Sequence, residues 1–203
     1  MAAELSDAHE IFDFFGVPLR EGLVENDVFD SGVAEYVLKE VLVPRAMGME
    51  DGPVAGIGPE HLPLAVCILA STGISLDPML KEPDDSTQDY ADLHRRLGDY
   101  TLFWAGMFPE SLRRTFRDRS FGPVVPGSSD PVQLFAAQGS ESYGNAADMV
   151  AHGQQISGYD GDPSVFRQLS SEYAGCLAAI GHVREVAFHP GLVSPDEIYG
   201  MLE

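Results

Sequence analysis

Cysteines, basic residues and long apolar runs are all scarce in this chain. Only two of its 203 residues are cysteines, Cys67 and Cys176, and each lies in an apolar helix-like run without a neighbouring cluster of possible ligands. The sequence therefore gives no C-x-x-C metal or redox motif, and both thiols are expected to be core residues, with a disulfide between them as the less favoured alternative. No segment approaches the roughly 18 consecutive apolar residues of a membrane span.

Positive charge is also sparse, since 12 Lys and Arg residues stand against 32 Asp and Glu, a net charge of −20. Such a charge repels phosphate backbones and anionic lipid surfaces over about a Debye length, roughly 8 Å in physiological salt. We therefore expect neither nucleic acid nor membrane as a partner. The first residues, M-A-A-E-L-S-D, contain no basic n-region and no apolar h-region. We therefore expect no secretory signal and a cytoplasmic location.

Apolar residues recur at helical spacing along the chain, whereas strand alternation is nowhere convincing. In the clearest segment, 86–108, Ser86 opens a capping pattern and a set of apolar residues falls within about 100° on a helical wheel. From Tyr100 onward the opposite side is apolar too, which is typical of a helix that enters the core. The apolar set is Tyr90, Leu93, Leu97, Tyr100, Trp104, Met107 and Phe108. Gly98 and Gly106 predict close approach by another part of the chain.

Capping residues and prolines divide the rest of the chain into further helices. The pairs Asp130-Pro131 and Asp162-Pro163 are typical of an N-cap followed by the first helical residue. We predict an all-α fold, a single-core bundle of about seven helices around the central buried helix at 86–108. The other predicted helices lie near residues 6–16, 31–44, 62–70, 109–119, 130–156, 162–188 and 194–202.

Charge and composition also suggest how the chain is organised. The first 60 residues hold 13 Asp and Glu against 3 Lys and Arg, half of the net charge in under a third of the chain. We interpret residues 1–60 as an acidic helical segment packed peripherally on the same domain. Residues 61–203 are then the helical core domain.

Searches for nucleotide and nucleophile motifs fail for physical reasons. G-I-G-P-E-H (56–61) lacks the third glycine of a dinucleotide fingerprint and follows no strand, and the chain contains no G-K-[ST]. G-S-E-S-Y-G (139–144) places one residue too many before Ser142 for a nucleophile elbow and lies in a helical pattern.

Two helical stripes have spacings that could present metal ligands, but each faces away from the predicted apolar side of its helix. Polar residues opposite the apolar side of a helix normally face water and need no metal to explain them. We therefore predict no metal site and no cofactor. The stripes are Glu141, Asn145, Asp148 and His152, and His182, Glu185 and His189.

Three blocks of the chain resemble a known group. L-G-D-Y-T-L-F-W-A-G-M-F-P-E (97–110) is followed by S-Y-G-N-A-A (142–147) and F-R-Q-L-S-S-E-Y (166–173). This order is similar to that of uncharacterised bacterial helical proteins, in which an L-G-D-aromatic-x-L-F-x-x-G-x-F-P-E stretch precedes a Tyr-Gly/Arg-x-Ala-Ala helix. The likeness covers roughly residues 90–188. It implies a compact helical fold; the group has no known activity, so no catalytic residue is implied.

Half of the twelve basic residues lie within 25 positions, and four of them, Arg113, Arg114, Arg117 and Arg119, form a dense patch. Arginine forks bind carboxylates and phosphates in a bidentate way, so the patch can serve an anion or an acidic partner. Pairing with nearby Asp and Glu residues is the simpler interpretation. Asp99 and Arg184 are the other notable charges, because each lies on an apolar part of its helix and a buried charge needs a partner.

Two functions remain open. The first is a non-enzymatic soluble helical protein that associates with itself or with a protein partner through apolar helix surface and the arginine patch. The alternative is a helical enzyme, or a protein that binds a small molecule or metal, with a site between helices. An enclosed cavity would favour the alternative, and a filled core with an exposed apolar patch would favour association. The residues of the alternative site are Asp99, Trp104, Tyr143 and Arg184.

Overall fold

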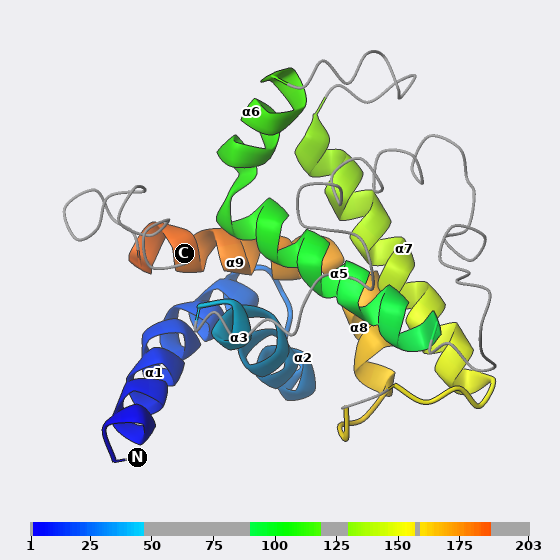
Figure 1. Ribbon diagram of the computed structural model, residues 1–203, viewed down its shortest axis with the longest axis horizontal. Coiled ribbons are helices and arrows are strands. Elements are labelled where there is room, and N and C mark those ends of the chain that lie inside the picture. Colours follow the sequence, from blue (N-terminus) through cyan, green and yellow to red (C-terminus); the bar gives the residue numbers. More distant parts are fainter. Residues whose placement is uncertain (1, 47–89, 119–129, 157–158, 188–203) are drawn as a thin grey trace.

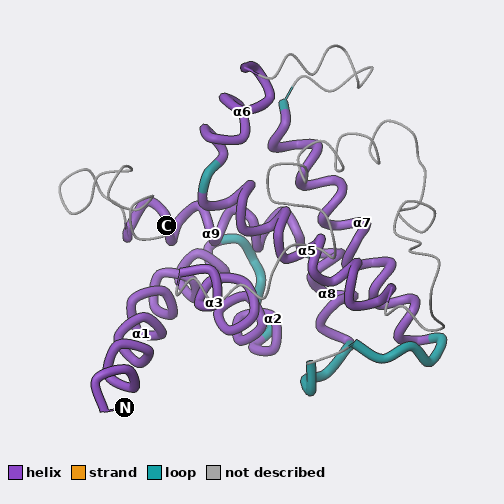
Figure 2. The backbone as a smooth tube through the Cα atoms, in the orientation of Figure 1, coloured by secondary structure: helices purple, strands orange, loops and turns teal. Residues whose placement is uncertain are grey.

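A computed structural model of the chain confirms the predicted all-α architecture. It describes residues 2–46, 90–118, 130–156 and 159–187, and within these ranges every regular element is a helix (Figures 1 and 2). Helices α2 (Ser31–Tyr36), η1 (Val37–Leu42) and α3 (Val43–Ala46) follow one another without a break and are called here the α2–α3 rod. The other described helices are α1 (Ala2–Glu25), α5 (Tyr90–Met107), α6 (Pro109–Asp118), α7 (Pro131–Ala151), α8 (Ser164–Ser171) and α9 (Tyr173–Ala187).

Helix α5 is the centre of the bundle, as the sequence predicts. It packs along α7 and α9 and also contacts η1 and α6 (Figure 1). Leu97 and Leu102, on different sides of the helix, are both buried and belong to different core clusters. Trp104 is partly buried and touches both clusters, which fits a helix covered by neighbours on more than one side. The predicted start at Ser86 lies outside the described residues.

Helix α1 corrects the prediction of a short helix ending near Gly16, because it runs on through Pro18 to Glu25. A proline inside a helix removes one backbone hydrogen bond and costs roughly 3 kcal/mol. Leu19 and Leu23 continue the buried face beyond the proline, where α1 packs on α9 and η1. Tertiary packing therefore keeps the helix going where local sequence signals favour a stop.

The α2–α3 rod begins where the sequence predicts. The Asp30 carboxylate accepts hydrogen bonds from the amides of Gly32 and Val33, at 2.7 and 3.0 Å, and so caps the first turn. Valines 33, 37 and 41 are fully buried, and they share one core cluster with α1, α5, α7, α8 and α9. The predicted domain boundary near residue 60 lies outside the described residues and stays a prediction.

The predicted helices 130–156 and 162–188 both differ from the structure. The N-cap at Asp130 is confirmed, since its carboxylate accepts the Val132 amide at 3.1 Å, but α7 ends at Ala151 and not near residue 156. The predicted single helix 162–188 is wrong, because Glu172 is non-helical and separates α8 from α9. The helices predicted at 62–70 and 194–202 lie outside the described residues.

Gly98 and Gly106 allow the close approach that the sequence predicts. A Cβ atom on Gly98 would lie 2.7–2.9 Å from the ring of Tyr143 on α7, and one on Gly106 would lie 2.5 Å from Ile180 on α9. Side chains at both positions would push the neighbouring helices away from α5. The two glycines therefore set the spacing of α5 from its two main neighbours.

Replacing Gly98 by alanine should lower the free energy of unfolding by about 1–3 kcal/mol, because the new methyl group overpacks against a buried ring. The matched control is Gly181→Ala in α9, where a Cβ meets nothing within 4 Å. That change should stabilise the protein by up to about 1 kcal/mol through helix propensity alone. Urea unfolding monitored by circular dichroism measures both; equal effects would contradict the packing role of Gly98.

Candidate functional site

Asp99 lies at the centre of a buried polar cluster and is only 2% exposed. Its Oδ1 accepts two hydrogen bonds, from the Tyr36 hydroxyl at 2.8 Å and from the Tyr143 hydroxyl at 2.7 Å. Its Oδ2 accepts a hydrogen bond from the Arg95 guanidinium at 3.0 Å. One carboxylate therefore connects α5 to α2 and α7.

The charge of Asp99 is balanced along α5 itself. Arg95, one turn earlier, also pairs with Asp92 at 2.8 Å, and Asp92 in turn pairs with Arg96 at 2.5 Å. Two carboxylates and two guanidinium groups thus alternate along one side of the helix. A buried charge is tolerated when it is paired and hydrogen-bonded in this way.

The surroundings of the cluster shift several pKa values in a consistent direction. Burial, and then the charge of Asp99, raises the pKa of the Tyr36 and Tyr143 hydroxyls well above the usual value for tyrosine. Burial alone would lower the pKa of Arg95, but the carboxylates of Asp99 and Asp92 outweigh it and the pKa rises. The stable state is therefore two neutral phenols and an ion pair.

Aromatic rings close over this cluster. The ring of Tyr36 meets those of Tyr143, Tyr159 and Phe166 edge-on, with centroids 6.3, 5.5 and 5.4 Å away. Both oxygens of Asp99 are already occupied by donors from the protein. The arrangement is suited to holding helices together, because it leaves the carboxylate neither exposed nor short of hydrogen-bond donors.

The structure brings together two of the four residues of the alternative site. Asp99 and Tyr143 share a hydrogen bond, whereas Trp104 packs its ring against Phe108, with centroids 5.2 Å apart. Arg184 forms an ion pair with Glu110 on α6, at 3.1 Å. These four side chains are thus engaged in three separate sets of contacts.

The arginine patch is partly engaged within the protein. Arg113 pairs with Asp130 at 3.1 Å, an ion pair that joins the middle of α6 to the start of α7, and Arg113 lowers the pKa of that carboxyl. The side chain of Arg114 is exposed. The side chain of Arg117 and all of Arg119 lie outside the described residues.

The first polar stripe is solvated or paired where the structure describes it, whereas His182 of the second stripe is half-buried against α1 and not solvated as predicted. Asp148 pairs with Arg167, and His152 is exposed with its Nδ1 2.7 Å from the Asp148 carbonyl oxygen. His182 lies 3.8 Å from Glu21 of α1, and His189 is outside the described residues. Over the described part of the chain, no group of three or more His, Cys, Asp or Glu side chains is placed to hold a metal ion.

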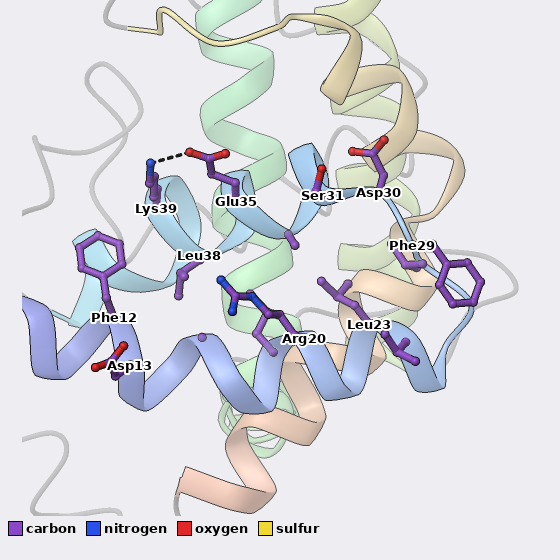
Figure 3. A pocket seen from close by; sticks show the side chains of 15 residues that line it. Phe12, Asp13, Arg20, Leu23, Phe29, Asp30, Ser31, Glu35, Leu38 and Lys39 are labelled. Atoms are coloured by element: carbon purple, nitrogen blue, oxygen red, sulfur yellow. Dashed lines mark hydrogen bonds and ion pairs between the residues drawn. The ribbon is translucent and has the colours of Figure 1, made fainter.

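A groove of about 610 Å³ lies between α1 and the α2–α3 rod (Figure 3). We call it the α1–α2 groove. Its rim includes two exposed apolar side chains, Val24 at 57% and Phe29 at 72% exposure. Its remaining apolar lining comes from Phe12, Leu19, Leu23, Val28, Ala34 and Leu38.

Charged side chains border the groove, and all but one have a partner. Lys39 and Glu35 pair with each other at 2.5 Å, and Asp30 caps α2 and accepts a hydrogen bond from Gln168 at 3.0 Å. Asp13 also has an interaction of its own. Arg20 extends from α1 toward the rod in Figure 3, and no described residue forms a hydrogen bond or ion pair with it.

A second pocket of about 610 Å³ lies against the other side of the rod. It shares Asp30, Ser31, Glu35 and Lys39 with the α1–α2 groove, but it is lined mainly by polar side chains, among them Tyr159 and Glu40. Burial raises the pKa of the Glu40 carboxyl, and burial followed by the Glu40 charge raises that of Tyr159 to about 12. The rod therefore separates an apolar groove from a polar one.

Sequence reasoning missed the α1–α2 groove and the role of Tyr36. One signal was available, because Val24 and Phe29 are large apolar residues in the most acidic part of the chain. A single apolar residue on a surface is common, however, and only the fold gathers Val24 and Phe29 at one rim.

Comparison with known proteins gives no relative from which a function can be transferred: no family, curated protein or solved structure matches the chain. The resemblance to bacterial helical proteins stays a prediction. In the described part of the chain, no helix is both long enough and apolar enough to cross a membrane.

Replacing Asp99 by asparagine should lower the free energy of unfolding by about 2–4 kcal/mol, because it leaves the buried Arg95 without one of its two carboxylates. Asp148→Asn is the matched control, since it removes the same charge from an ion pair on a helix surface and should cost less than about 1 kcal/mol. Urea unfolding of both variants measures the difference. Similar losses would mean that burial does not distinguish the two ion pairs.

Alkaline conditions should destabilise the fold through the same cluster. The pKa of Tyr36 and Tyr143 is raised in the folded state, so their stabilising contribution is complete below pH 10 and falls as the pH rises above it. The expected loss is about 1.4 kcal/mol per tyrosine and pH unit. In urea titrations at pH 9–11, the double variant Tyr36→Phe/Tyr143→Phe should lose stability less steeply than the wild type; equal slopes would contradict the role of the two hydroxyls.

Proposed function

We propose that this protein acts without catalysis, by binding another protein in the α1–α2 groove. The observation that carries the proposal is the pair of exposed apolar side chains, Val24 and Phe29, on the rim of an apolar groove. Exposed apolar surface that is gathered around a concavity is typical of an interaction site, whereas single exposed apolar residues are not informative.

The dimensions of the groove suit a helix. Helix α1 borders it from Phe12 to Val24, which is a length of about 18 Å at 1.5 Å per residue. Three turns of a partner helix have a similar length, and helix-in-groove binding is a recurring mode of protein recognition. Apolar residues at i, i+4 and i+7 of such a helix would enter the groove.

The alternative function, a small-molecule or catalytic site around Asp99, Trp104, Tyr143 and Arg184, has less support. The hydrogen-bonding capacity of Asp99 is taken up by Tyr36, Tyr143 and Arg95. A general base must reach the proton that it abstracts, and this carboxylate is enclosed by protein groups. The observed contacts instead favour the interpretation of Asp99 as a structural residue.

A displayed library of helical peptides tests the proposal. The peptides are about 18 residues long, biased toward apolar residues at i, i+4, i+7 and i+11 but with Asp, Glu, Lys and Arg also allowed there, and all other positions are randomised. We expect selection on the purified protein to enrich peptides whose binding falls at least about tenfold in the double variant Val24→Ser/Phe29→Ser.

The matched control is Val17→Ser/Phe14→Ser. These residues are of the same types, lie on α1 with exposures of 57% and 51%, and do not line the groove. Since all four side chains are exposed, both double variants should fold normally, within about 0.5 kcal/mol for each change. Absence of any enriched peptide, or equal loss of binding in the two variants, would overturn the proposed function.

A further inference from the structure

Resting on the proposed function, we propose that the partner helix carries one carboxylate within its apolar stripe, and that Arg20 of the α1–α2 groove binds it. The inference concerns the chemistry of the partner. It follows from Arg20, the one charged side chain among the described residues lining the groove that has no hydrogen bond or ion pair.

The state of the groove's other charges is what singles out Arg20. Glu35 is neutralised by Lys39, at 2.5 Å. The Asp30 carboxylate accepts hydrogen bonds from two backbone amides and from the Gln168 side chain. The hydrogen bond from Gln168 contributes most to lowering the pKa of Asp30. A cation that entered the groove would therefore meet carboxylates that already have partners, whereas a carboxylate would meet a free guanidinium.

The position of Arg20 also fits a contact inside the interface. It lies on α1 between Phe12 and Val24, the residues that mark the two ends of the groove along this helix, and it points toward the rod (Figure 3). A partner helix in the groove would cover it and exclude water from it. Arginine and aromatic residues are enriched in the energetically dominant parts of interfaces, here Arg20 and Phe29.

A carboxylate is the group that matches a guanidinium fork, since two parallel N–H···O hydrogen bonds can form. The partial exclusion of water strengthens this contact relative to one on an open surface. The proposal fixes only the position opposite Arg20. At other positions of the partner helix, the net charge of −20 favours basic residues through its long-range field.

A second copy of this chain is the less favoured occupant. Two copies would bring together two surfaces of the same strongly acidic protein, and this self-repulsion opposes association. We therefore assign the groove to a different protein.

Charge reversal tests the inference with the peptide library described above. On the wild type, we expect enriched peptides to carry Asp or Glu at one position of the apolar stripe. On Arg20→Glu, selection should instead enrich Lys or Arg at that position. Exchanging the peptides between the two proteins should weaken binding at least about tenfold in each direction.

Arg114→Glu is the matched control, because it makes the same change at an exposed arginine of α6 outside the groove. Selection on this variant should return the wild-type preference. Circular dichroism of the three proteins checks that the changes leave the fold intact.

Each result has a defined meaning. Enrichment of the same peptides on the wild type and on Arg20→Glu overturns the inference but leaves the proposed function standing, provided that Val24→Ser/Phe29→Ser still abolishes binding. If no peptide enriched on the wild type depends on Val24 and Phe29 for binding, both the inference and the proposed function are overturned. A dimer seen by sedimentation velocity and broken by Val24→Ser/Phe29→Ser would make a second copy the occupant, and would overturn the inference as well.

Discussion

The hydrogen bonds to one carboxylate fix how the main helices of this protein meet. Asp99 on α5 receives hydroxyl groups from α2 and α7, and it receives a guanidinium from its own helix. Because the carboxylate is almost completely buried, each donor is needed to offset the cost of removing a charge from water. These directional bonds add a requirement on helix orientation to the one that apolar packing already imposes. The α2–α3 rod is therefore held against α5 in a defined orientation.

The glycines of α5 make this arrangement possible. Tyr143 reaches Asp99 only because Gly98, one residue earlier, has no side chain to displace its ring. The hydrogen bond between Tyr143 and Asp99 and the close packing of α5 on α7 therefore both depend on Gly98. A larger residue at position 98 would separate the helices and at the same time lengthen the hydrogen bond.

Much of the fold could be predicted from the sequence, because it follows from local signals. The N-cap of α7 at Asp130, the restart of the chain at Pro109 and the all-round apolar surface of α5 each depend on a few neighbouring residues, and all three are found in the structure. The errors occur where distant contacts outweigh local ones. Helix α1 continues through Pro18 because its far half packs on α9 and η1, and no local pattern contains that information.

The candidate site was harder to predict for the same reason. That Asp99 needs a partner could be inferred, and Arg95 lies one turn away on the same helix, but Tyr36 is 63 positions away in the sequence. The α1–α2 groove has no sequence motif, since its walls come from two helices and its apolar residues are separated by charged ones. Its character depends on which side chains face each other after folding.

The buried cluster and the groove are connected through the α2–α3 rod. One side of the rod carries Tyr36, which is fixed by Asp99, and another side carries Ala34 and Leu38, which line the groove. At the end of η1, the Val43 amide donates to the Leu38 carbonyl five residues back, a wider turn than that of an α-helix. Because the rod is anchored in the core, this wall of the groove is ordered in the protein alone. Binding of the proposed partner helix would then need little further loss of conformational entropy in this protein.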